Sequence, residues 1–175
     1  KKVLLADALG QVADGAFSAG DQLTVSLAWL GAVAYTLQLY FDFSGYTDMA
    51  IGLGRVFGFH LPENFNYPYI SKSASEFWRR WHMTLSFWFR DYVYIPLGGN
   101  RCSRGRHLIN LLVVWLLTGL WHGSAWNFVL WGLYYFVLLM LDRLFWQKLL
   151  DKLPKAVSAV LSHITLPLAV LFGWV

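Results

Sequence analysis

An apolar stretch from Leu108 to Leu141 is too long to cross a membrane once as a single straight helix. Such a helix would be about 50 Å long at about 1.5 Å per residue, whereas the hydrocarbon core of a bilayer is about 30 Å thick. The sequence TGLWHGSAWNF, residues 118–128, offers a break between Gly119 and Ser124. A first half that ends there would be only about 20 Å long. Its end would lie at membrane depth, where irregular backbone is tolerated only inside protein or beside a water-filled cavity.

The composition also indicates a membrane protein. Hydrophobic residues make up 57% of the chain and charged residues only 14%, and the mean hydropathy is +0.45. Soluble domains are about a quarter charged. The formal net charge of +4 fits basic loops beside membrane spans better than a nucleic-acid surface, because the cations are not gathered in one soluble patch. We therefore expect contact with membrane lipid and none with nucleic acid.

Three other segments are expected to be helical and membrane-associated. Residues 23–41 are about as long as one span requires, which is about 20 residues. Residues 45–62, which are apolar but broken by glycines, suit a short and partly buried helix. Residues 156–175 form a further candidate span, bent at Pro167. The predicted fold class is therefore all-α, in a polytopic membrane protein.

Two basic segments, 96–107 and 143–155, should share the cytoplasmic side, so that the stretch between them crosses an even number of times or enters and returns. The chain begins with Lys1-Lys2 and stops inside the apolar run LAVLFGWV. Residues 1–175 are therefore interpreted as a single membrane domain that is truncated at both ends.

A further helix is predicted from Ala74 to about Tyr94, because Ser73 and Glu76 form a capping box ahead of an aromatic run. Two stripes follow from its spacing. One is aromatic or apolar, with Phe77, Trp81, Leu85, Trp88 and Phe89, and the other is polar, with Arg79, His82, Ser86 and Arg90. The helix either lies at the membrane surface or lines a water-filled cavity with its polar stripe. On the second interpretation these polar residues are candidates for binding substrate.

Among the five histidines, His122 is the best candidate for chemistry. An ionisable side chain within the membrane is costly and marks a functional site by default, although a histidine packed and hydrogen-bonded in a helix bundle is the alternative. A neutral imidazole can take a proton from a hydroxyl and so make its oxygen a nucleophile. Ser124 lacks the Gly-x-Ser-x-Gly setting of a covalent nucleophile. His60 and His107 suit interfacial positions, and His163 suits a packing role.

Other polar residues have weaker signals. Asp42 and Asp48 are acids in an apolar setting, where they should pair with an arginine or orient a donor. Cys102 is the single cysteine, which excludes an intrachain disulfide and a cysteine cage for zinc. We expect it to be a free thiol. We expect no metal site, because there is no His-Glu-x-x-His pair and no ligand spacing joins His82 to His122.

Three long motifs resemble one family. YFDFSGYTDMAIGLGRVFGF, FWRRWHMTLSFWFRDYVYIPLGGNR and TGLWHGSAWNFVLWGL occur in order and are similar to the membrane-bound O-acyltransferases, in particular the bacterial alginate O-acetyltransferase type. The resemblance implies that His122 is the catalytic histidine and His82 the second characteristic histidine. Trp121 and Asn127, within the third motif, become candidates for the substrate tunnel. The implied fold is a ring of helices around a central tunnel.

The resemblance also implies a reaction and a place. An acyl group, acetyl in this type, would move from a cytoplasmic donor to hydroxyls of an extracytoplasmic polysaccharide such as alginate. The donor, acetyl-CoA or an acyl carrier, would be a co-substrate, with no tightly bound cofactor. The protein would be multi-pass in the bacterial cytoplasmic (inner) membrane, beside other polysaccharide-modifying envelope proteins. D-alanyl transfer to teichoic acid remains an alternative, as does a transporter with a polar pathway at membrane depth.

Overall fold

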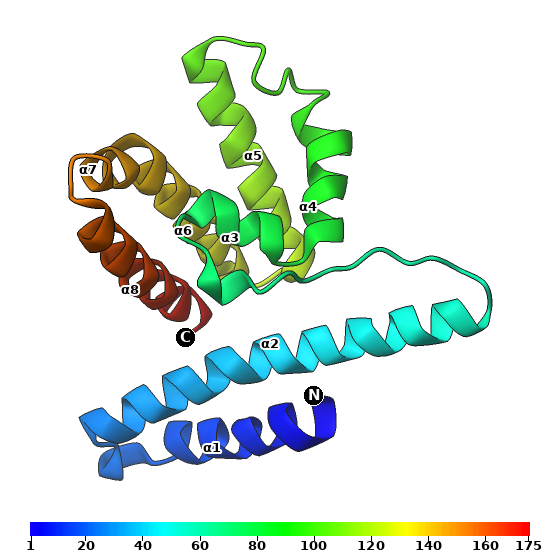
Figure 1. Cartoon of the computed structure of the whole chain (residues 1–175), viewed down its shortest axis with the longest axis vertical. Coiled ribbons are helices and arrows are strands. Elements are labelled where there is room, and N and C mark those ends of the chain that lie inside the picture. Colours follow the sequence, from blue (N-terminus) through cyan, green and yellow to red (C-terminus); the bar gives the residue numbers. More distant parts are fainter. The chain divides into compact units, whose positions relative to one another are not determined.

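The computed structural model describes residues 1–175, and all of its regular elements are helical (Figure 1), which confirms the all-α prediction. The chain forms two compact units. The first consists of Lys1–Phe65 with Val170–Val175, and the second of Asn66–Ala169. Because His82 and His122 both belong to the second unit, that unit positions the candidate site.

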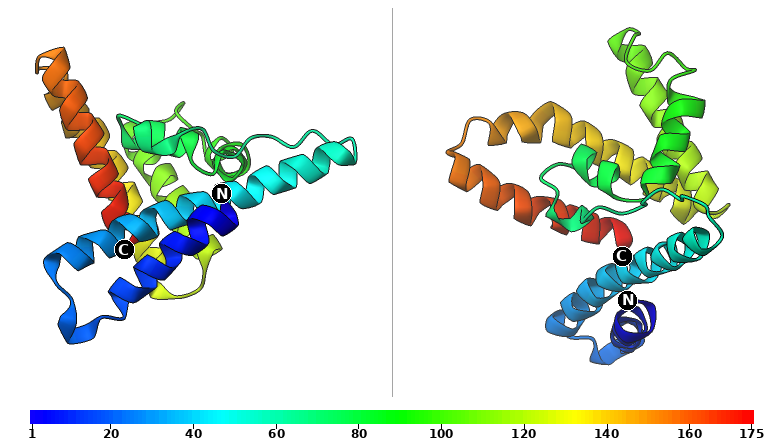
Figure 2. Two further views of the ribbon diagram at one scale, coloured as in Figure 1. Left: turned by 60° about the horizontal axis from the view of Figure 1, so that its bottom comes forward. Right: turned by 45° about the vertical axis from the view of Figure 1, so that its right-hand side comes forward.

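The first unit is built on a pair of antiparallel helices. A π-helical turn, Lys2–Ala6, leads into α1 (Asp7–Phe17), and a 3-10 turn, Gly20–Gln22, precedes α2 (Val25–Val56). Figures 1 and 2 show α1 and α2 side by side in every view. Small residues allow this close approach, since a Cβ on Gly31 would lie 2.6 Å from the Cβ of Ala16.

The prediction that 23–41 and 45–62 form separate helices is wrong, because α2 is one continuous helix of 32 residues. The glycines inside 45–62 only weaken a helix. The helix ends at a Schellman motif instead. There Gly58, at φ 80°, donates its N–H to the carbonyl of Arg55 at 3.1 Å, and Phe59 donates to that of Gly54 at 2.8 Å.

The second unit contains six α-helices joined by short turns. In chain order they are α3 (Ala74–Arg80), α4 (Met83–Phe89), α5 (Arg104–His122), α6 (Trp126–Leu141), α7 (Gln147–Leu150) and α8 (Lys155–Trp174), of which the last turns of α8 belong to the first unit. A 3-10 turn, Pro68–Ile70, precedes α3, and π-helical turns follow α4 (Arg90–Tyr94) and α6 (Asp142–Trp146).

The predicted Ser73 cap at the start of α3 is confirmed, and Glu76 reaches back to the residue before the cap. The Ser73 hydroxyl accepts the N–H of Glu76 at 3.1 Å, and the Glu76 carboxylate accepts the N–H of Lys72 at 2.9 Å. Arg80 completes the turn with an ion pair to Glu76 at 2.8 Å. The bond from the Lys72 backbone, followed by the contact with Arg80, lowers the pKa of the Glu76 carboxyl group.

The prediction of one helix from Ala74 to Tyr94 is wrong. The helix stops at Arg80, Trp81 is extended, His82 is left-handed, and α4 begins at Met83. The two predicted stripes therefore do not run along a common axis. Nothing in FWRRWHMTLSF signals this break, because the segment contains neither glycine nor proline.

The predicted break between Gly119 and Ser124 is confirmed, since α5 ends at His122 and α6 begins at Trp126. The helix α5 begins at Arg104, four residues before the apolar run, so its 19 residues extend about 28 Å. Only the stretch from Leu108 onward is uncharged and apolar, and that stretch is about 21 Å long.

Two helices are long and apolar enough to span a membrane, Trp126–Leu150, which joins α6 to α7, and Lys155–Trp174, which is α8. The second agrees with the predicted span at 156–175. The predicted span at 23–41 is not among them. Gln38 within this segment and Asp42 directly after it lower the hydropathy of α2.

Candidate active site

His122 occupies the last position of α5, directly before the turn. After the turn, α6 runs back along α5. The Trp131 ring therefore lies against the imidazole, with ring centroids 4.8 Å apart and an interplanar angle of 70°. The Phe128 ring lies nearly parallel to the imidazole at 6.5 Å, and Trp121 lies edge-on at 4.9 Å. Three aromatic rings thus flank the imidazole, while the His122 residue itself is exposed in this chain, and no carboxylate hydrogen-bonds to it.

His82 reaches the same place from a different part of the chain. Its ring lies 5.8 Å from that of Trp121, at an interplanar angle of 69°. Its backbone has φ 45° and ψ 52°, in the left-handed region that residues other than glycine rarely adopt. The structure therefore brings the two motif histidines, 40 residues apart in sequence, to one tryptophan.

A tightly packed aromatic core supports this arrangement. Tyr135 is fully buried, and it contacts Trp78 of α3 at 4.8 Å, Trp131 at 4.9 Å and Trp115 of α5 at 5.7 Å between centroids. Aromatic pairs of this kind each add about 0.5–1.5 kcal/mol beyond the area they bury. Because Trp131 also contacts His122, the core couples α3, α5 and α6 to the position of that imidazole.

Two glycines allow α5 and α6 to cross closely beside the site. A Cβ on Gly119 would collide with the backbone carbonyl of Phe128, and a Cβ on Gly132 with that of Trp115. A Cβ on Gly123 would overlap the Phe128 ring. Helices that approach this closely are typical of membrane proteins, where small residues let backbones meet.

Other residues of the predicted polar stripe do not join the histidines. Ser86 donates its hydroxyl to the Trp78 carbonyl at 3.1 Å, so it satisfies the end of α3. Arg79 is exposed and bonds to the Ser75 carbonyl of its own helix at 3.2 Å. Arg90 is exposed and pairs with Asp91 at 2.7 Å. The contacts of Ser86, Arg79 and Arg90 are therefore local and structural.

Asp42 and Asp48 lie on α2, in the first unit, and their predicted arginine partner is wrong. Asp42 pairs with Lys2, and Asp48 pairs with Lys1 at 2.6 Å. Both carboxylates are about half exposed, at 46% and 50%, so they are not the buried acids that the sequence indicated. The lysines reach them because the start of the chain packs along α2.

The turn after His122 is open in this chain. Trp121 is 57% exposed, and the whole of residues 124–127, including Ser124 and Asn127, is exposed.

No group of three His, Cys, Asp or Glu side chains is placed to hold a metal ion. Cys102 is a free thiol that donates to the Gly99 carbonyl at 3.3 Å. His163 contacts the Ala159 carbonyl of its own helix at 2.6 Å.

Sequence reasoning missed the roles that four residues play in the site region. Trp131 and Phe128 contact His122, and Gly119 and Gly132 set the helix crossing. A signal for the tryptophan was present, because Trp131 and Tyr135 are four residues apart and so share a helix face with Phe128. The glycines gave no such signal, since a close approach depends on the partner helix.

Comparisons with known proteins agree with the motifs. The model of the membrane-bound O-acyltransferase family matches residues 1–152. Over all 175 residues the chain is 51% identical to a protein of Azotobacter vinelandii named probable alginate O-acetylase, of which it covers 34%. It is 48% identical over 82% of its length to a peptidoglycan O-acetyltransferase of Helicobacter pylori, of which it covers 27%. Identity to a teichoic acid D-alanyltransferase of Bacillus subtilis is 40% over 69% of the chain and 33% of that relative. The chain spans about a third of the length of such relatives.

Proposed function

We propose that this chain, which belongs to the membrane-bound O-acyltransferase family, carries the catalytic histidine of an enzyme that transfers an acyl group to envelope polysaccharide. The acyl group is acetyl and the acceptor is a polysaccharide such as alginate, in line with the names of relatives about half identical to this chain. The observation that carries the proposal is the meeting of His122 and His82 on Trp121 at a break between two helices.

His122 acts as the general base in this mechanism. Its neutral imidazole takes the proton of an acceptor hydroxyl, and the hydroxyl oxygen attacks the acyl carbonyl carbon. The ester bond forms as the bond between the acyl group and the donor's leaving group breaks, and the imidazolium returns its proton to that leaving group. Acetyl-CoA or an acyl carrier fits the donor role, with a thiol as leaving group. His82 orients donor or acceptor from the far side of Trp121.

The proposal extends to the setting of the site. The chain is part of a multi-pass protein of the bacterial cytoplasmic (inner) membrane, in which a ring of helices surrounds a tunnel. The two candidate spans and the apolar surroundings of the break after His122 support this placement. Other polysaccharide-modifying envelope proteins would act beside it.

Replacement of His122 in the full-length protein tests the mechanism. His122→Gln keeps a polar side chain but cannot take up the proton, so we expect acyl transfer to fall by about 10²–10⁴-fold, the usual worth of general-base catalysis. His163→Gln is the matched control, because His163 bonds only to its own helix, and it should transfer normally. Mass spectrometry of the product distinguishes acetyl from D-alanyl. Wild-type transfer by His122→Gln would refute the assignment.

Ser124 tests the direct route. Ser124→Ala should retain transfer, because no covalent acyl-enzyme is required when the hydroxyl attacks the donor itself. The measurement is product formation together with mass spectrometry of the protein after reaction with donor alone. An acyl group trapped on Ser124 would contradict direct transfer.

A further inference from the structure

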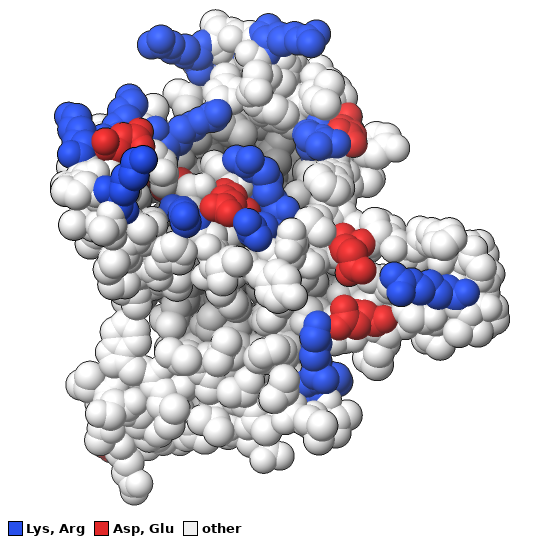
Figure 3. Space-filling view, viewed as in Figure 1, with Lys and Arg blue, Asp and Glu red and all other residues white.

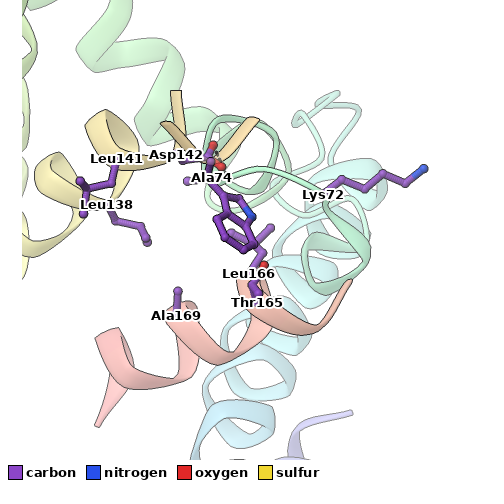
Figure 4. A pocket seen from close by; sticks show the side chains of 9 residues that line it. Lys72, Ala74, Leu138, Leu141, Asp142, Thr165, Leu166 and Ala169 are labelled. Atoms are coloured by element: carbon purple, nitrogen blue, oxygen red, sulfur yellow. Dashed lines mark hydrogen bonds between the residues drawn. The ribbon is translucent and has the colours of Figure 1, made fainter. Parts of the chain in front are cut away.

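A cavity of about 240 Å³ lies in the second unit, away from the two histidines. Its walls come from the end of α6, the start of α3 and the middle of α8, and Figure 4 shows Leu138, Leu141, Leu166 and Ala169 around it. Trp146 and Thr165 complete the lining together with Lys72, Ala74 and Asp142. The volume is below the range of about 300–1,000 Å³ that drug-sized ligands require, so a slender ligand fits best.

The interior is mostly carbon, and the polar side chains of Asp142 and Thr165 in its wall already have partners. The Asp142 carboxylate is buried and accepts two bonds, from the Ala74 N–H at 3.0 Å and from the Gln147 side-chain amide at 2.8 Å. The Thr165 hydroxyl donates to the Leu161 carbonyl of its own helix at 2.9 Å. A polar group that entered would lose its hydration and find few partners besides the Trp146 indole N–H. The part of the ligand inside the cavity must therefore be hydrocarbon.

Basic residues lie on two segments that contribute to the lining of the cavity. The Lys72 side chain extends away from the lining (Figure 4), and the segment that follows Asp142 carries four exposed basic residues, Arg143, Lys148, Lys152 and Lys155, with Asp151 as its exposed acid. Figure 3 shows that Lys and Arg side chains outnumber Asp and Glu on the visible face of the second unit. Basic clusters at the cytoplasmic end of spans attract anionic lipid headgroups.

Two further observations place this region at a membrane interface. The helices that contribute most of the walls are the two candidate spans. Trp146 is half-buried in the lining, and tryptophan is enriched at the level of the headgroups.

We infer that this cavity holds an acyl chain of an anionic phospholipid, whose headgroup meets Lys72 and the basic segment 143–155. The hydrocarbon lining takes the chain, and the cations outside select the negative headgroup. The site differs from the acyl-transfer site in place and in the residues that form it.

The experiment uses the full-length protein in bilayers of phosphatidylglycerol or phosphatidylcholine, with retained lipid counted by mass spectrometry after purification. Wild-type protein should retain phosphatidylglycerol in preference to phosphatidylcholine. Ala169→Phe fills the cavity and should abolish this retention, whereas Ala156→Phe, the same change at an exposed position of α8, should preserve it. Equal loss in both variants, or equal retention of both lipids, would overturn the inference.

Headgroup and chain can be tested separately. Lys72→Gln should weaken phosphatidylglycerol retention about fivefold, which corresponds to about 1 kcal/mol for one lysine near anionic lipid, and Lys72→Arg should restore it. Phosphatidylglycerol with bromine on its acyl chain should quench wild-type tryptophan fluorescence more than that of Trp146→Phe. No difference in quenching would mean that another segment of the protein fills the cavity, which would also overturn the inference.

Discussion

At the scale of single residues, His82 combines a rare backbone conformation with a place beside the catalytic candidate. Its φ of 45° lies in a region that costs about 1–3 kcal/mol for most residues but that histidine, like asparagine, adopts more often than other residues with side chains. Asparagine tolerates this region and valine does not. In the full-length protein, His82→Asn should therefore keep the thermal stability but reduce turnover, whereas His82→Val should lose about 1–3 kcal/mol of stability as well. Thermal unfolding in detergent and acyl transfer measure the two effects. Wild-type turnover by His82→Asn would limit His82 to shaping the turn.

At the scale of secondary-structure elements, the crossing of α5 and α6 fixes the surroundings of His122. A methyl group on Gly132 would collide with the Trp115 carbonyl, and overpacking of this kind costs about 1–3 kcal/mol. Gly132→Ala should therefore lower thermal stability and also transfer activity, because it displaces the helix that carries Trp131. Gly105→Ala is the matched control, since nothing lies within 4 Å of the added Cβ, and alanine there should stabilise α5 by up to about 1 kcal/mol. Identical melting temperatures and activities for the two variants would show that the helices separate without cost.

At the scale of the whole molecule, the basic segments 96–107 and 143–155 should lie on one side of the membrane. In the proposed topology, the path between them enters the membrane along α5, turns after His122 and returns along Trp126–Leu150. In a Cys102→Ser background of the full-length protein, Arg101→Cys and Lys152→Cys should both react with a membrane-impermeant maleimide only from the cytoplasmic side. Labelling of the two positions from opposite sides would contradict a return after His122 and with it the placement of that residue at depth.

The sequence alone determined the features that depend on local chemistry. Helix content followed from the long apolar runs, the start of α3 from Ser73 and Glu76, and the end of α5 from the glycines around His122. These signals work because caps and glycines act on neighbouring backbone within one turn.

Tertiary structure decided the rest. The segment around His82 has helical spacing, yet it forms a turn that propensity alone does not favour. Two contacts are made at this turn, the hydrogen bond from Ser86 to Trp78 and the ring contact of His82 with Trp121. The helix α2 continues through its glycines. It packs against α1, and ion pairs such as that of Lys2 with Asp42 join it to the start of the chain. Propensities differ by less than about 1 kcal/mol per residue, so contacts between residues far apart in sequence override them.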